Sequence, residues 1–255
     1  MEHAKLGYRL GKAFHLAVKD VSFEIYPAET MILLGPSGCG KSTLLKSIAG
    51  FLDLAAGSIS LQRNSSLKPG PDRAVVFQEF DQLFAWRTVL DNIAYPLRRN
   101  GRRKPVADER ARHYLDMMGL TAAADRFPHQ LSGGMKQRVA IARALALEPL
   151  MLLMDEPFGS LDALTRSRLQ GELNDIATKT RVTILFVTHS IEEAITLGDR
   201  IVILSQPPSV VREIVTVSEA AKRADSEDYL DMRSHLRHML LSAGEEEDDV
   251  ASPFE

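Results

Sequence analysis

Short, almost uninterrupted apolar runs recur along the chain. They are four to six residues long and lie at Met31 to Leu34, Ala74 to Phe77, Leu150 to Met154 and Val182 to Val187. Runs of this length are typical of strands in a parallel sheet, because both faces of such strands are covered. Apolar residues at helical spacing follow the first run at Leu44, Leu45 and Ile48. The alternation of strands with helices predicts an α/β fold.

The pattern changes along the chain in a way that suggests its organisation. Residues 1 to about 82 carry strands, about 83 to 147 are mostly helical in pattern, and about 148 to 206 return to strands alternating with helices. Beyond Pro207 and Pro208, the segment from Glu219 to Leu241 predicts a helix, and an acidic run follows it. We expect a core domain over 1–206 with a helical subdomain at about 83–147, and a C-terminal helical extension with an acidic tail over 207–255.

Composition narrows the class of protein. At 255 residues and 45% hydrophobic, the chain can bury a substantial core in one large domain or two lobes. A net charge of −3 gives no reason to expect nucleic acid as a partner. No apolar stretch approaches the roughly 18 to 20 residues that span a bilayer, and no signal-peptide core precedes the first strand. The single cysteine, Cys39, excludes an internal disulfide and fits a reducing cytoplasm.

A glycine-rich segment joins the first apolar run to its helix. It reads Gly35, Pro36, Ser37, Gly38, Cys39, Gly40, Lys41, Ser42 and Thr43. Its glycines let the backbone aim several N–H groups at one anion, while Lys41 can reach the β- and γ-phosphates and the Ser42 hydroxyl can bind Mg²⁺. A glycine-rich turn with an incidental lysine would lack the strand before it and the helix after it. The segment therefore predicts a nucleoside triphosphate site.

A second glycine pair opens another helical pattern. Ser132 precedes Gly133 and Gly134, and apolar residues then recur at helical spacing. Ser132 is expected to cap this helix, whose free N–H groups form a second anion site. Taken alone, this sequence would favour an ordinary capped helix. Beside a phosphate-binding loop, the anion-binding interpretation is favoured.

Polar residues follow the other apolar runs, where the carboxyl ends of parallel strands gather. Asp155 and Glu156 come after the third run, Gln78 after the second and His189 after the fourth. Asp155 suits a Mg²⁺ ligand, and Glu156 suits the base that orients and deprotonates water. A lone histidine is more often structural, but a sensor of the γ-phosphate needs a hydrogen-bond donor at such a strand end.

Together these motifs resemble the nucleotide-binding subunit of an ABC transporter. The signature Leu131 to Gly134 stands in full, with Met135 where the family more often has glutamine, and Ser160 to Asp162 matches the family's D-loop. The resemblance covers nearly all of residues 1 to 206. It implies a P-loop NTPase core of RecA-like type with a mostly parallel sheet, an N-terminal antiparallel β subdomain and an inserted helical signature subdomain. It also implies ATP and Mg²⁺ as ligands, and a dimer in which each signature closes over the other copy's ATP.

The resemblance assigns further roles residue by residue. Gln78 matches the Q-loop glutamine, which can join Ser42 and Asp155 around Mg²⁺, and His189 matches the switch histidine. An aromatic near the N-terminus should stack on adenine, with Tyr8 preferred and Phe14 as the alternative. The pair Ala28 and Glu29 departs from the family's usual Gly-Glu turn.

Two segments point toward a membrane partner. Bulky residues after Gln78, namely Phe80, Leu83, Phe84 and Trp86, either pack in the core or line a groove that receives a short helix from a permease subunit. Five cationic residues, Arg98, Arg99, Arg102, Arg103 and Lys104, are expected in an exposed loop that could approach anionic lipid. The expected location is the cytoplasmic face of the inner membrane, as a peripheral subunit.

Within the family, Leu83 to Val89 with Asn92, and Asp155 to Arg166, look most like the nitrate, sulfonate, taurine and bicarbonate importers. This implies ATP-driven import through separate permease subunits, with an external solute-binding protein. Two other functions stay open: a soluble ABC ATPase in translation or repair, and the ATPase of a lipid-transport or export system.

Overall fold

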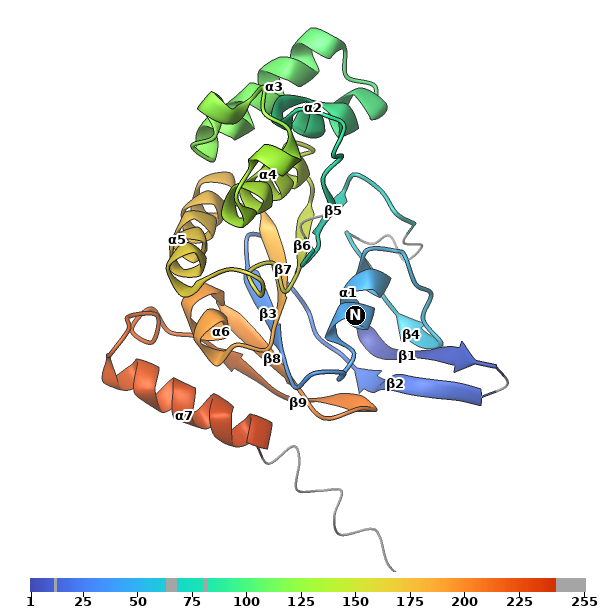
Figure 1. Ribbon diagram of the computed structural model, residues 1–255. Helices are drawn as coiled ribbons and strands as arrows, with labels where there is room; N and C mark the ends of the chain where they lie inside the picture. The colour runs from blue at the N-terminus through green and yellow to red at the C-terminus, as the bar shows by residue number, and fades with distance from the viewer. Residues whose placement is uncertain (12, 63–67, 80–81, 242–255) are drawn as a thin grey trace, which may run out of the picture. The chain divides into compact units, whose positions relative to one another are not determined.

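The computed structural model describes residues 1–11, 13–62, 68–79 and 82–241, which form parts of two compact units. Unit 1 comprises residues 1–68 and 186–255, and unit 2 comprises residues 69–185. Unit 2 is therefore inserted in the sequence of unit 1, and the chain crosses between them within strand β7 (Thr183–Thr188). Figure 1 traces the elements of both.

Unit 1 is built on a mixed sheet with the strand order β4-β1-β2-β9-β8-β3. The strands are β1 (Glu2–Leu10), β2 (Ala13–Val21), β3 (Thr30–Leu34), β4 (Ala56–Ser58), β8 (Arg200–Leu204) and β9 (Ser209–Thr216). Strand β1 pairs antiparallel with β2 and β4, whereas β3 pairs parallel with β8. The predicted α/β fold with antiparallel N-terminal strands and a parallel core is confirmed.

The core of unit 1 surrounds β3, whose five residues are all buried. The helices are α1 (Lys41–Ile48), α6 (Ile191–Leu197) and α7 (Glu227–Leu241). Helix α7 begins eight residues after the predicted start at Glu219, so that boundary was wrong. The hydroxyl of Ser226 accepts a hydrogen bond from the Tyr229 amide at 3.1 Å and caps the helix there. The acidic run at 245–249 lies outside the described residues.

Unit 2 places helices around two parallel strands, β5 (Arg73–Val76) and β6 (Met151–Asp155), with Arg73 opposite Met151. The helices are α2 (Val89–Arg99), α3 (Lys104–Met117), α4 (Gly133–Leu145) and α5 (Ala163–Thr180), with 3-10 turns η2 (Thr121–Ala123) and η3 (Pro128–Gln130). The predicted helical pattern at about 83–147 corresponds to α2, α3 and α4. No helix within the described residues is both long and apolar enough to cross a bilayer.

Candidate functional site

The predicted phosphate-binding loop follows β3 directly, and its last three residues, Lys41 to Thr43, form the start of α1. Lys41 is 5% exposed, and its ammonium donates hydrogen bonds to the carbonyls of Gly35 and Pro36, each at 2.8 Å. The Lys41 side chain therefore folds back across the loop, and its ammonium is held at the first two residues of the loop. Because α1 has neither an acidic residue in its first turn nor a side-chain cap among the described residues, its N-terminal N–H groups suit an anion.

Glycine is required in this loop for two different reasons. Gly40 has a φ of 90°, in the left-handed region, and a Cβ there would lie 2.9 Å from a Val18 methyl carbon. Gly35 is required by close packing instead, since a Cβ added there would lie 2.8 Å from the Cys39 sulfur. Any larger residue at either position would push the loop out of shape.

Cys39 is fully buried inside the loop. Burial raises the pKa of its thiol above the usual range, and the nearby Lys41 ammonium, 3.8 Å away, only partly opposes this rise. The thiol is thus held protonated at neutral pH, which agrees with the interpretation that Cys39 fills space rather than acting as a nucleophile.

Two other predicted nucleotide contacts belong to unit 1. Tyr8 lies on β1 with 54% of its surface exposed, and its ring stacks on His15 with centroids 6.0 Å apart and planes 17° from parallel. The side chain of Phe14, the alternative partner for adenine, lies outside the described part of the chain. His189 is exposed and directly follows β7, as expected from the sequence.

In unit 2 the signature forms the start of α4. The Ser132 hydroxyl accepts a hydrogen bond from the Met135 amide at 3.4 Å, so the predicted N-cap is present. Gly134 lies against α5, where a Cβ would come within 2.7 Å of a Thr165 methyl carbon. Close approach of the two helices thus depends on this glycine.

The two parallel strands of unit 2 deliver polar residues to one edge. Asp155 ends β6, and Glu156 follows with a φ of 44°. A glutamate in this left-handed region stores strain, and such strain is found mainly at functional positions. The Gln78 amide nitrogen lies 3.0 Å from the point where Gly159 would carry a Cβ, so Gln78 reaches the loop that carries Glu156. Carboxylate, amide and hydroxyl oxygens are the ligands that Mg²⁺ prefers, so Asp155, Gln78 and Ser42 fit that ion chemically.

The aromatic segment after Gln78 divides between core and surface. Leu83 is 5% exposed, whereas Trp86 is 73% exposed. Phe84 is half-buried, and its ring packs T-shaped with the Tyr95 ring, with centroids 5.2 Å apart. Phe80 lies outside the described residues. Sequence reasoning did not foresee the role of Asn92. Its buried side-chain amide accepts a hydrogen bond from the Phe84 backbone N–H and donates to three backbone carbonyls between positions 84 and 88. These bonds fix the turn in which the exposed Trp86 lies.

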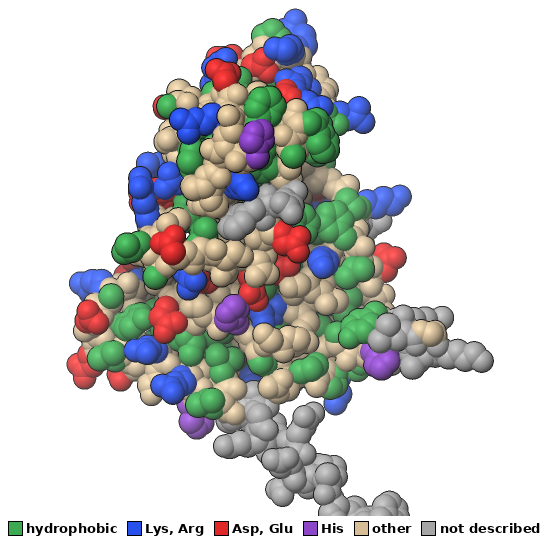
Figure 2. All heavy atoms as spheres, viewed as in Figure 1, with side chains coloured by type: hydrophobic (Ala, Val, Ile, Leu, Met, Phe, Trp, Pro, Cys, Tyr) green, Lys and Arg blue, Asp and Glu red, His purple; other side chains and the backbone are tan. Residues whose placement is uncertain are grey.

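The cationic segment covers the end of α2, the turn after it and the start of α3: Arg98 and Arg99 end α2, and Lys104 begins α3. Figure 2 shows Lys and Arg side chains at that end of unit 2. Arg98 pairs with Asp91 and Asp108, and Lys104 pairs with Asp108 at 2.6 Å. Burial alone would raise the pKa of Asp91, but hydrogen bonds and charge from Arg98 and Arg87 outweigh it and lower that pKa. The prediction of an exposed loop therefore holds only for Arg102 and Arg103, since the other three residues belong to helices and Arg98 is held in ion pairs.

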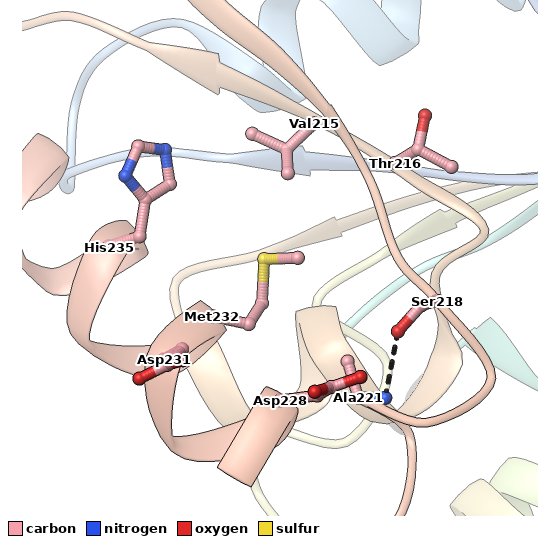
Figure 3. A pocket seen from close by; sticks show the side chains of 8 residues that line it. All are labelled: Val215, Thr216, Ser218, Ala221, Asp228, Asp231, Met232 and His235. Atoms are coloured by element: carbon pink, nitrogen blue, oxygen red, sulfur yellow. Dashed lines mark hydrogen bonds between the residues drawn. The ribbon is translucent and has the colours of Figure 1, made fainter.

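A separate hollow of 340 Å³ lies between β9 and α7 in unit 1 (Figure 3). Its lining residues are Val215, Thr216, Ser218, Ala221, Asp228, Asp231, Met232 and His235. None of them is a predicted nucleotide contact.

Comparison with known proteins decides the family. The sequence model described as ABC transporter matches residues 18–159, which is more than half of the chain. This chain belongs to the ABC transporter family. It is 43% identical to the taurine import ATP-binding protein of Rhizobium johnstonii over 95% of this chain and 96% of that protein. It is 44% identical to a nitrate import ATP-binding protein of Synechococcus elongatus over 90% of this chain, but it spans only 36% of that longer protein.

Solved ABC cassettes share the fold. A dimeric ATP-binding cassette bound to ADP and phosphate, MJ0796, superimposes with a TM-score of 0.74 at 31% identity, covering 85% of this chain and 97% of that one. A cassette from Clostridium perfringens, part of the cbiONQ ABC transporter complex, gives a TM-score of 0.76 at 26% identity, covering 84% and 86% of the two chains. The chain is thus an ABC-type ATPase in both sequence and fold.

The predicted site residues of this ABC ATPase divide between the units. Unit 1 holds Tyr8, the phosphate loop at 35–43 and His189; unit 2 holds Gln78, the signature at 132–134, and the pair Asp155 and Glu156. Within unit 2, Gln78 and the Glu156 loop are in contact.

Proposed function

We propose that this chain is the ATP-binding and ATP-hydrolysing subunit that drives import of a small anion through separate permease subunits. The anion is of the nitrate, sulfonate, taurine or bicarbonate class. One observation carries the proposal: the 43% identity to a taurine import ATP-binding protein extends over almost the full length of both chains. The subunit then works as a peripheral protein at the cytoplasmic face of the inner membrane, and a solute-binding protein delivers the anion to the permease.

The residues of each unit have distinct tasks in this proposal. The Lys41 ammonium and the N–H groups at the start of α1 bind the phosphates, and Tyr8 stacks on the adenine. Ser42, Gln78 and Asp155 hold Mg²⁺, which neutralises phosphate charge when bound. Glu156 accepts the proton of the attacking water at its carboxylate, and His189 donates a hydrogen bond to the γ-phosphate.

Hydrolysis in this proposal requires a second copy of the chain. Ser132, Gly133 and Gly134 lie at a capped helix N-terminus, which suits them to the γ-phosphate bound by the other copy. The dimeric state of the related cassette MJ0796 supports this arrangement. Closure of the dimer around two ATP molecules then moves the permease.

Glu156→Gln tests the hydrolytic role on the isolated chain at high protein concentration. The amide keeps the shape of the side chain but removes its basicity, so turnover should fall by roughly two to four orders of magnitude, the usual weight of a positioned base. Phosphate binding remains, so an ATP-dependent dimer should accumulate and be visible by light scattering. Glu109→Gln, on the exposed face of α3, is the matched control and should keep wild-type turnover. Normal hydrolysis by Glu156→Gln would remove Glu156 from the base role.

Mixing two inactive variants tests the shared site. Lys41→Ala and Ser132→Arg should each abolish turnover alone, because every site in such a homodimer lacks one element. A one-to-one mixture forms heterodimers with one complete site, which should restore about a quarter of wild-type turnover if the two sites act independently. Failure of the mixture to regain activity, although heterodimers form, would contradict the shared site.

A further inference from the structure

A buried carboxylate lies four residues after His189. Glu193, on α6, is only 5% exposed, which is unusual for a glutamate and requires polar partners. One partner is the hydroxyl of Thr188, which donates to the Glu193 Oε2 atom at 2.5 Å. Thr188 is the last residue of β7 and is itself 2% exposed. The pair therefore lies in the core of the strand-to-helix turn that carries His189.

The hydrogen bonds of this pair involve both sequence neighbours of His189, Thr188 and Ser190. The Thr188 hydroxyl also accepts from the backbone amide of Ser190 at 3.0 Å. The Ser190 hydroxyl in turn accepts from the backbone amide of Glu193 at 3.2 Å and caps α6. Thr188 is thus bonded to the Glu193 carboxylate, and Ser190 is bonded to the Thr188 hydroxyl and to the Glu193 backbone, while the imidazole itself is exposed.

The direction of these bonds is fixed by the carboxylate. The Ser190 N–H occupies a lone pair of the Thr188 oxygen, so the Thr188 proton points at the Glu193 carboxylate oxygen, which accepts it. An amide at position 193 could instead present its N–H groups to Thr188 and reverse that bond. A glutamate therefore permits one arrangement of the turn, where a glutamine permits two.

We propose that Glu193 is a positioning residue for His189: through Thr188 and Ser190 it holds the turn from which the imidazole reaches the γ-phosphate. This inference rests on the role proposed above for His189. Glu193 itself touches no nucleotide in this scheme. Loss of the Glu193 interaction should therefore lower kcat and leave the affinity for ATP unchanged.

Thr188→Val is the most direct test, because it replaces the hydroxyl by a methyl group of similar size. We expect kcat to fall roughly ten- to a hundred-fold, the cost of loosening the support of a reacting group. The KM for ATP should stay within about twofold, since the phosphate loop supplies the affinity. Thr188→Ser keeps the hydroxyl and should recover most of the lost turnover. A rise in KM with unchanged kcat would overturn the proposal.

Combination with His189→Ala separates positioning from a general structural role. If Thr188 and Glu193 act through the imidazole, Thr188→Val should cost nothing further in kcat once His189 is alanine. An equal loss in both backgrounds would show that the pair acts elsewhere and would overturn the inference. Should Thr188→Val fail to fold, Glu193→Gln keeps the size of the side chain and should show a smaller loss in kcat, again absent from the His189→Ala background.

The same series distinguishes this inference from the proposed function. Wild-type turnover in His189→Ala would refute the role of His189 and the inference with it. A large loss in His189→Ala, together with none in folded Thr188→Val and Glu193→Gln, would leave the role of His189 intact and overturn the positioning role alone.

Discussion

Gln137 offers a sharp test of how this fold balances stability against function. Its side chain is fully buried in α4, and neither its amide nitrogen nor its amide oxygen has a hydrogen-bond partner among the described residues. Burial of an unpaired amide costs about 1 to 3 kcal/mol. Methionine has a similar volume and a similar helix propensity without the polar atoms. Gln137→Met should therefore stabilise the protein by roughly 1 to 3 kcal/mol.

Thermal denaturation measures this gain directly. For a chain of this size, 1 kcal/mol corresponds to about 2 to 4 °C in Tm, so the expected rise is at least about 2 °C. Gln137→Glu is the opposite control, because a buried charge without a partner should cost several kcal/mol. Gln137 also lies one helical turn after Gly134 of the signature, and buried unpaired groups persist mainly at functional positions. We expect ATP turnover of Gln137→Met to fall while Tm rises.

A lower Tm for Gln137→Met would refute this reasoning. It would indicate that a buried water with two to four polar partners hydrogen-bonds the Gln137 amide, and that the methionine side chain displaces this water.

Three further predictions follow from local geometry. Ala28 has a φ of 63° at the third position of the Tyr26–Glu29 turn. Ala28→Gly should relieve this left-handed strain and, after the entropy cost of glycine, stabilise the protein by about 0.5 to 1 kcal/mol. Thermal denaturation should then show a higher Tm, and a lower Tm would contradict this expectation. Because Cys39 is buried and burial raises its pKa, iodoacetamide at pH 7 should modify it at least about tenfold more slowly than an unfolded-chain thiol, and urea should abolish the difference. Trp86 is exposed, so Trp86→Ala should change the free energy of unfolding by less than about 0.5 kcal/mol, yet weaken co-purification with the permease. Leu83 is buried, so Leu83→Ala should lower the free energy of unfolding by about 2 to 5 kcal/mol. Unfolding of Trp86→Ala would favour the core interpretation of that tryptophan.

Much of the fold could be predicted because its signals are local. The buried strand β3 gives a continuous apolar run, since both its faces are covered, and Ser132 is recognisable as a cap from the glycines and helical spacing that follow it. The start of α7 was missed because Ser218 and Glu219 resemble a helix start as closely as Ser226 and Glu227 do. The Ser218 hydroxyl even accepts a hydrogen bond from the Ala221 amide at 3.0 Å, as the Ser226 hydroxyl does from the Tyr229 amide, but the chain forms turns over 219–225 and becomes helical only after Ser226.

Buried polar residues were the main failure of sequence reasoning. Asn92, Gln137 and Glu193 each interrupt a helical pattern as surface residues do, yet each is 5% exposed or less. Two of them are buried by local turns that helical periodicity does not describe: Asn92 bonds to the backbone four to eight residues before it, and Glu193 bonds to Thr188 five residues before it. The limits of unit 2 at 69 and 185 are set by tertiary contacts, which periodicity does not report either.

The distribution of the site residues has a consequence for mutagenesis. The groups proposed to give ATP its affinity, Lys41 and the start of α1, belong to unit 1, whereas the proposed base Glu156 belongs to unit 2. Binding energy from the phosphate loop is present before and during hydrolysis, but a base acts only in the transition state. Lys41→Ala should thus weaken binding of a fluorescent ATP analogue, by roughly tenfold or more for a lost charge-assisted contact. Glu156→Gln should leave that binding within about twofold of wild type and lose turnover. Equal losses of affinity in both variants would show that the carboxylate contributes to holding the nucleotide, and the division of tasks between the two units would be wrong.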